Sequence, residues 1–147
     1  MGKLKRTAAD DWFSKCVRER AQWTCELCNT HHADGAAKGS SRSLDCSHFV
    51  SRGNWSVRFD PLNAFCHCTA CHFRFGGDKF LQETHYRDVF GEGAEQIILE
   101  KKQDTTIGRM ARKEVKEIAK HYKAEFERMR KLRAEGVMGR IEFTGYY

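Results

Sequence analysis

Two Cys-x-x-Cys pairs carry the clearest chemical signal in this sequence. They are Cys25/Cys28 and Cys68/Cys71, and they lie far apart along the chain. Four thiolates in two such pairs can close a tetrahedral zinc site, which would fasten the two segments together. Because a site with four thiolate ligands has no open coordination position, we expect this zinc to be structural and not catalytic.

The sequence contains seven cysteines, so three of them lie outside these pairs. We expect Cys16 and Cys46 to be small buried residues. Cys66 could compete with Cys68 as a ligand, but only Cys68 stands at the Cys-x-x-Cys spacing from Cys71.

Two histidines and an asparagine lie between and beside the cysteine pairs. Their order, His48, Asn63, His72, is that of an HNH nuclease core, in which a hairpin and a following helix hold one divalent ion. An imidazole with a pKa of about 6.5 can take a proton from water at neutral pH. Carboxylate, imidazole and water oxygen suit Mg²⁺ or a similar ion. The pattern therefore predicts metal-dependent hydrolysis of a phosphodiester.

Several spaced motifs give the chain a resemblance to a known family. They are Cys25-Glu-Leu-Cys28, Asp45-x-x-His48-Phe49, Arg58-Phe59-Asp60-x-x-Asn63, Cys68-x-x-Cys71-His72 and Gly77-Asp78. With them the chain resembles the NinG/Rap proteins of lambdoid phages, which are relatives of the HNH, or ββα-metal, nucleases. The resemblance covers about residues 10 to 132 and is weaker in the helical parts.

The resemblance implies a role for each central residue. His48 would be the general base, and Asn63 would brace the loop that carries His48 by hydrogen bonding to its backbone. His72 would bind the catalytic metal, Mg²⁺ or Mn²⁺. The activity implied is that of an endonuclease that acts on DNA, most specifically on branched recombination intermediates such as Holliday junctions.

Asp45 is our first choice for the second ligand of the catalytic metal. Many HNH enzymes have an aspartate directly before the base, where this chain has a serine. In a regular strand Asp45 and His48 would point to opposite faces, so a bulge or bend is expected between them. Asp78 and Asp60 follow as candidates, although Asp60 could instead be a turn residue or the ion-pair partner of Arg58.

Three arginines are expected to contact DNA around this site. Arg52, Arg58 and Arg74 could bind phosphates, and Trp55 could stack on a base. The alternative is that they are ordinary surface arginines and a core tryptophan. The net charge of +6 and the pI of about 9.0 agree with a phosphate-bearing partner.

The expected fold class is α+β, a small zinc-stapled ββα-metal core with flanking helices and a long C-terminal helix. Residues 1–22 form a basic segment and a helix, 23–104 the nuclease core with short helices, and 105–147 a basic amphipathic helix and tail. The expected helices are Thr7 to about Gln22, Lys79–Phe90, Ala94–Gln103 and Ile107–Ala134, and the expected hairpin strands are Leu44–Val50 and Ser56–Phe59 around a turn at Arg52-Gly53-Asn54.

The remaining expectations concern surroundings and partners. No signal-like or membrane-spanning run is present, so we expect a cytoplasmic protein in the host cell. The apolar stripe of the last helix could pack on its own domain or on a second copy in a homodimer. Two functional alternatives stay open: an HNH nickase of duplex DNA without junction preference, and a zinc-stabilised DNA-binding module without catalysis.

Overall fold

The computed structural model describes residues 4–32 and 44–147. Within them it shows a mixed α+β fold with six α-helices and one two-stranded sheet, in agreement with the coarse fold class expected from the sequence. Residues 1–3 of the expected basic segment and residues 33–43 of the expected core lie outside the described residues. No helix in the described ranges is long and apolar enough to cross a membrane.

Helix α1 spans Ala8–Arg20 and begins with the capping box predicted at Thr7 and Asp10. The Thr7 side chain accepts a hydrogen bond from the Asp10 backbone, and the Asp10 carboxylate accepts one from the Thr7 backbone. This exchange satisfies amides that the first helical turn would leave unpaired. The apolar face of α1, with Phe13 and Val17, is fully buried in the core.

The sheet pairs β1 (Leu44–His48) with β2 (Ala64–Cys68) in antiparallel register, from Leu44 opposite Cys68 to His48 opposite Ala64. The prediction of a second strand at Ser56–Phe59 is wrong. That segment forms turns, because its carbonyls bond to side chains rather than to a strand. The 3₁₀ turn η1 (Pro61–Asn63) then leads into β2.

Three short helices follow the sheet. They are α3 (Thr69–Gly76), α4 (Lys79–Phe90) and α5 (Ala94–Lys102). The predicted bounds of α4 are confirmed, with Asp78 at its N-cap and Gly91 at its C-cap. Gly91 has φ of +84°, a left-handed value that favours glycine at the end of a helix.

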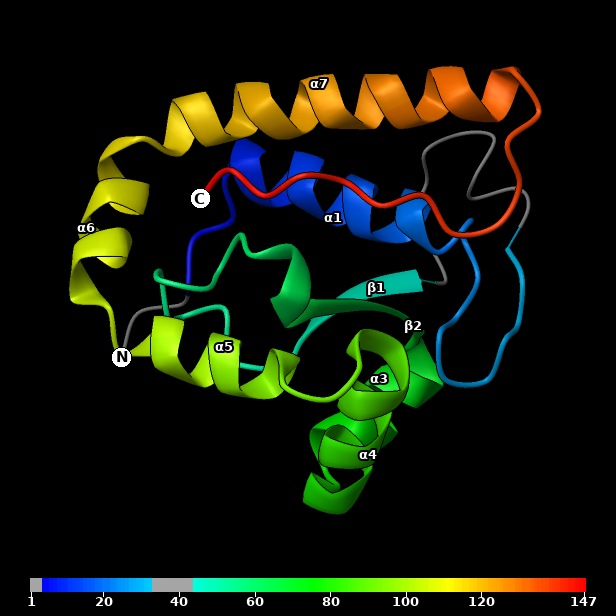
Figure 1. The fold of residues 1–147 in the computed structure, drawn as a ribbon, viewed down its shortest axis with the longest axis horizontal. Helices are drawn as coiled ribbons and strands as arrows, with labels where there is room; N and C mark the ends of the chain where they lie inside the picture. The colour runs from blue at the N-terminus through cyan, green and yellow to red at the C-terminus, as the bar shows by residue number, and fades with distance from the viewer. Residues whose placement is uncertain (1–3, 33–43) are drawn as a thin grey trace.

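The predicted helix Ile107–Ala134 is two helices, α6 (Thr105–Lys113) and α7 (Val115–Ala134). Glu114 separates them, and α6 turns aside to lie against the loop that follows β1 (Figure 1). A Cβ on Gly108 would come within 3.0 Å of the Ser56 Oγ, so glycine permits this close approach. The amphipathic pattern runs through both helices and therefore does not reveal the break.

Helix α7 runs along α1 in Figure 1, and the C-terminal tail returns beside them. The α7 stripe, including Ile118, Tyr122 and Met129, is buried in the same hydrophobic cluster as α1. The stripe thus packs within its own chain, and a homodimer through this helix stays a prediction. Residues of all three predicted segments share this cluster.

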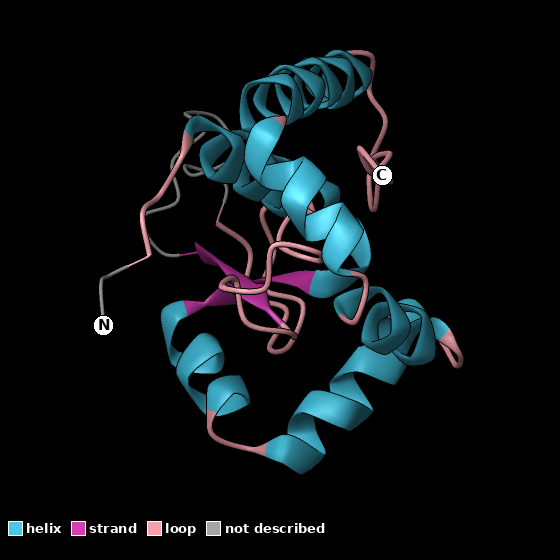
Figure 2. Cartoon of the chain, turned by 90° about the vertical axis from the view of Figure 1, so that its left-hand side faces the viewer, coloured by secondary structure: helices cyan, strands magenta, loops and turns pink. Residues whose placement is uncertain are grey.

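The sheet lies between the α1/α7 layer and the shorter helices in both views (Figures 1 and 2). One hydrophobic cluster joins Leu44 and Cys66 to α1 and α7. A second joins Phe65 to Phe75 on α3 and Tyr86 on α4. The two strands therefore hold helices on both faces, and the ends of β1 and β2 position the candidate sites.

Candidate active site and cysteine metal site

The four cysteines of the two Cys-x-x-Cys pairs meet in one cluster. The Sγ atoms of Cys25, Cys28, Cys68 and Cys71 all lie within 4.8 Å of one another, and those of Cys28 and Cys68 are 3.9 Å apart. Zinc–sulfur bonds of about 2.3 Å in a tetrahedron place sulfurs about 3.8 Å apart. This cysteine cluster could therefore hold a metal ion such as zinc with little rearrangement.

A tight turn presents the first pair. The Cys25 amide donates to Thr30 O at 2.9 Å, and the Asn29 amide donates to Cys25 O at 2.8 Å. The Cys28 Sγ lies 3.2 Å from the Thr30 hydroxyl, and hydrogen bonding to Thr30 lowers the pKa of the Cys28 thiol to about 6. The turn thus favours a thiolate at its exposed end, which is the form that binds metal.

The sheet presents the second pair. Cys68 ends β2, and Cys71 lies in the first turn of α3. Glu26 ties the first turn to β2, since its amide donates to Cys66 O and its carboxylate accepts from the Cys66 amide, both at 2.8 Å. Cys66 itself is buried, outside the cluster, and burial raises the pKa of its thiol.

His48 ends β1 and is partly buried. Its Nε2 lies 3.0 Å from the backbone carbonyl oxygen of Arg58. A carbonyl only accepts, so Nε2 carries the proton and Nδ1 keeps its lone pair. Burial lowers the pKa of His48 to about 4, so the imidazole is neutral at neutral pH. Nδ1 has no hydrogen-bond partner among the described residues, and this nitrogen can accept a proton.

Asn63 fixes the loop that follows His48. Its Oδ1 accepts from the Val50 amide at 2.7 Å, and its Nδ2 donates to Val50 O and Val57 O, each at 3.0 Å. Asn63 is fully buried, so these bonds are shielded from water. They join the Asn63 side chain to the backbone of the loop, which is what we expected of a residue that braces this loop.

Arg58 is a buried structural residue in the described chain. Its guanidinium makes two hydrogen bonds with the Asp10 carboxylate, at 3.0 and 2.7 Å, and donates to Lys5 O at 2.9 Å. It is 1% exposed and lies over the Trp55 ring. This corrects the expectation that Arg58 contacts DNA. Of the two alternatives considered for Asp60, the ion pair with Arg58 is not formed. The sequence did not predict that Asp10 would pair with Arg58. Its position three residues after Thr7, in a capping box, indicated only that the carboxylate would be ordered.

Asp45 and His72 come together although they belong to different elements. Asp45 Oδ2 on β1 lies 3.0 Å from His72 Nδ1 on α3, and both side chains are partly exposed. Metal–ligand distances of about 2.1 Å in an octahedron place neighbouring ligand atoms about 3.0 Å apart. The pair thus has the spacing and the donor types to hold a divalent ion.

The other two carboxylates considered for this role are used elsewhere. Asp78 caps α4 by accepting from the Leu81 amide at 3.0 Å. Asp60 accepts from the Leu62 amide and pairs with Lys101 at 2.6 Å. Neither side chain lines the pockets at His72.

A pocket of about 320 Å³ joins the histidines. His48 and His72 line it together with Arg52, while α1 contributes Asp10, Phe13 and Ser14, and Arg6 and Cys46 complete the lining. A second pocket of about 480 Å³ continues on the Asp45 side. The structure therefore brings His48, His72 and Arg52 to one concave surface. Arg74 is exposed in the last turn of α3 and lines neither pocket.

Comparison of the chain with family models, with curated proteins and with solved structures found no match.

Proposed function

We propose that this protein is a metal-dependent endonuclease of the HNH type that hydrolyses phosphodiester bonds in DNA. The observation that carries the proposal is the state of His48. Its Nε2–H binds the Arg58 carbonyl, its Nδ1 has no hydrogen-bond partner among the described residues, and His48 lines a pocket that His72 also lines. A base of fixed tautomer beside a possible cation site is what water activation requires.

The succession of elements also supports the proposal. Strands β1 and β2 precede α3, which gives the order strand, strand, helix, with His48 on the first strand and His72 on the helix. Asn63 binds the backbone of the loop that follows β1, and the cysteine cluster joins the end of β2 and the start of α3 to the Cys25–Cys28 turn.

The mechanism assigns a task to each side chain. His48 Nδ1 accepts a proton from water, whose oxygen then bonds to phosphorus as the bond to the 3′-oxygen breaks. The leaving 3′-oxygen takes a proton from solvent water, which leaves 5′-phosphate and 3′-hydroxyl ends. The Arg58 carbonyl accepts from Nε2 and steadies the imidazolium that forms. Arg52 binds the phosphate from the pocket wall. A divalent ion held by Asp45 and His72 would supply positive charge at the phosphate and the leaving oxygen.

The preferred substrate in this proposal is branched DNA, the expectation that comes from the NinG/Rap resemblance. One base and one metal can cut any accessible phosphodiester, so a preference for junctions must arise from contacts outside the pocket. Exposed basic side chains on α6 and α7, such as Arg109, Lys116, Lys120 and Lys123, are the candidates.

The test is cleavage of supercoiled plasmid, a synthetic four-way junction and matched linear duplex at fixed salt, with Mg²⁺ or Mn²⁺ and with EDTA. His48→Ala protein purified in parallel serves as the blank. We expect metal-dependent cleavage with the junction cut fastest. Equal cleavage of junction and duplex would support the nickase alternative, and binding without cleavage would support the non-catalytic module.

A further inference from the structure

Arg18 is a buried arginine that forms no ion pair with an acidic residue in the ranges 4–32 and 44–147. It lies on α1, is 4% exposed, and its Nε makes no hydrogen bond in the described chain. Its hydrogen bond to Ser14 Oγ is long, at 3.4 Å, and its guanidinium lies 5.3 Å from the centre of the Trp23 ring. Burying a charge that is not paired with an opposite charge costs stability, and burial lowers the pKa of this guanidinium.

Arg20, on the same helix, shows how the fold treats a purely structural buried arginine. Its two terminal nitrogens donate to Pro61 O at 2.8 Å and to Ala64 O at 2.6 Å. It is fully buried and lines none of the pockets described above. The Nε of Arg20, like that of Arg18, has no hydrogen-bond partner in the described chain, so the two arginines differ in their terminal nitrogens. Those of Arg18 make one long bond, to Ser14, and its guanidinium keeps donors for a ligand.

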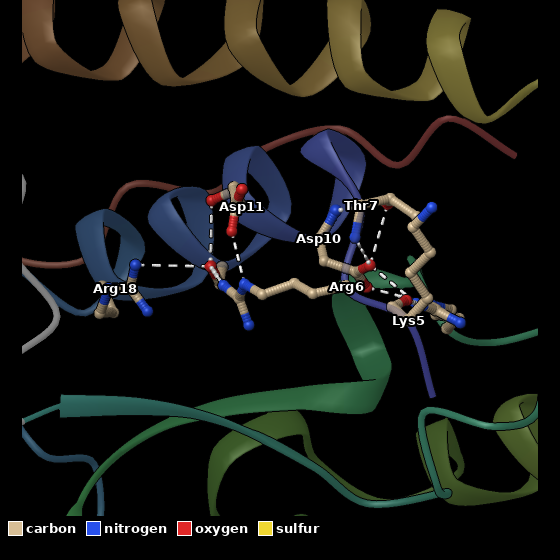
Figure 3. A network of polar contacts seen from close by, with 8 residues as sticks. Lys5, Arg6, Thr7, Asp10, Asp11 and Arg18 are labelled. Atoms are coloured by element: carbon tan, nitrogen blue, oxygen red, sulfur yellow. Dashed lines mark hydrogen bonds and ion pairs between the residues drawn. The ribbon is translucent and has the colours of Figure 1, made fainter. Parts of the chain in front are cut away.

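Arg18 lines the pocket of about 480 Å³ that adjoins the candidate active site. Asp45 and His72 line this pocket too, and Arg6 lies on the same wall. Figure 3 shows Arg6 and Arg18 along α1, with Asp11 beside the Arg6 guanidinium. Asp11 pairs with Arg6 and Asp45 contacts His72, so among the described residues that line this pocket Arg18 has no ion-pair partner of its own.

The two pockets share three lining residues. Arg6, Cys46 and His72 line both, with Arg52 and His48 at one end and Arg18 at the other. A guanidinium fork binds phosphate oxygens through two parallel hydrogen bonds, and such bonds are strong when both partners are charged. A strand that places one phosphate at His48 would carry its next phosphate along this surface.

We propose that Arg18, assisted by Arg6, forms a second phosphate site beside the candidate active site. The site takes the backbone phosphate that neighbours the scissile one. The inference deepens the proposed function and rests on it for the identity of the ligand as DNA.

The first arm of the test is independent of cleavage. Zinc-loaded protein with ¹⁵N-labelled arginine is titrated with inorganic phosphate, and with chloride at equal ionic strength, while the Nε–H signals are followed by NMR. We expect the Arg18 signal to shift to saturation with phosphate alone and the Arg20 signal to stay in place. An Arg18 signal that does not move, or that moves equally with chloride, overturns the inference.

The second arm uses oligonucleotides with one neutral methylphosphonate placed at successive positions. In wild type we expect about a tenfold loss of binding when the neutral group is next to the cleaved bond, because a charged hydrogen-bond pair is removed. The affinity of the Arg18→Gln protein should not change when the neutral group is at that position. If the Arg18→Gln protein loses as much affinity as wild type does, the second phosphate site is not at Arg18.

A stability measurement separates binding from architecture. Arg18→Met should keep or raise the melting temperature, because it removes a buried charge that makes one long hydrogen bond. Arg20→Met should lower it, because two backbone carbonyls lose their donor. An equal loss in both variants would make Arg18 structural and overturn the inference. If Arg18 responds to phosphate in a protein that cleaves no DNA, the proposed function fails and the phosphate site stands.

Discussion

Asp45 and His72 meet at 3.0 Å across the gap between β1 and α3, with the carboxylate oxygen against the imidazole nitrogen. Asp45 and His48 are three residues apart in β1, and an odd offset in a regular strand directs side chains to opposite faces. We expected a bulge or bend to bring Asp45 and His48 to one ion, but β1 pairs in unbroken register with β2. His72 on α3 links the two residues instead, because it contacts Asp45 and also lines the pocket of His48.

We therefore predict that Asp45→Ala weakens binding of the divalent ion. The Mn²⁺ concentration for half-maximal cleavage should rise at least about tenfold, since one ligand is lost. Asp78→Ala is the matched control, because it removes an α4 cap at a cost of about 1 kcal/mol and leaves the pair intact. A metal titration that shifts with Asp78→Ala and not with Asp45→Ala would place the ion elsewhere.

Zinc should be bound by the cysteine cluster and should be needed for folding. Purified protein is expected to contain about one tightly held zinc per chain by metal analysis. Cys71→Ser should lose zinc and unfold, because the free energy of zinc binding contributes to folding. Cys66→Ala, which changes a neighbouring buried cysteine outside the cluster, should keep the zinc. A folded, zinc-free Cys71→Ser protein would refute the assignment.

The Arg58–Asp10 ion pair should matter for stability. Arg58→Gln leaves the Asp10 carboxylate buried without its partner, which typically costs about 3–5 kcal/mol of unfolding free energy. Burial raises the pKa of Asp10, but the Arg58 and Thr7 contacts outweigh it and lower the pKa overall. The carboxylate therefore stabilises the fold above its unfolded pKa, and that stability is lost as the pH falls through the folded pKa.

Denaturant unfolding as a function of pH measures both effects. Arg74→Gln is the control, because Arg74 is exposed at the end of α3. An Arg58→Gln protein as stable as wild type would show that the pair contributes nothing.

Cleavage should stay active well below the ordinary pKa of histidine. The base must be neutral to accept a proton, and burial lowers the pKa of His48 to about 4. The rate of the chemical step should therefore be nearly level from about pH 7 to pH 6 and fall only as the pH approaches 4. Single-turnover cleavage with saturating metal at each pH measures this. A rate that halves near pH 6.5 would mean that His48 is not the base or is not buried in solution.

The sequence predicted the parts of this protein that depend on local pattern. The α1 capping box, the bounds of α4 and the meeting of the four cysteines follow from spacing and caps. The second strand did not, since β propensity at Ser56–Phe59 is overridden by bonds from Asn63 and Tyr122 to its carbonyls. Hydrogen bonds of this kind leave no periodic pattern in the sequence, so the pattern of residues does not predict them.

The same limit applies to the site. His48, Asn63 and His72 were found by their order, but the role of Arg58 was not, because nothing near Arg58 in the sequence shows that Asp10 will neutralise it. The Nε of Arg18 has no hydrogen-bond partner in the described chain, and this likewise depends on which side chains the fold brings near it.

The central claim is that His48 is the catalytic base, and the most direct measurement is the single-turnover cleavage rate of His48→Ala. His121→Ala is the matched control, because His121 Nε2 also lies within bonding distance of a backbone carbonyl, Thr144 O at 2.7 Å, but on α7. We predict that His48→Ala lowers the rate by about 10²–10⁴-fold with folding, zinc content and DNA binding unchanged, while His121→Ala cleaves as wild type does. A His48→Ala protein that cleaves within a few fold of wild type would contradict the account.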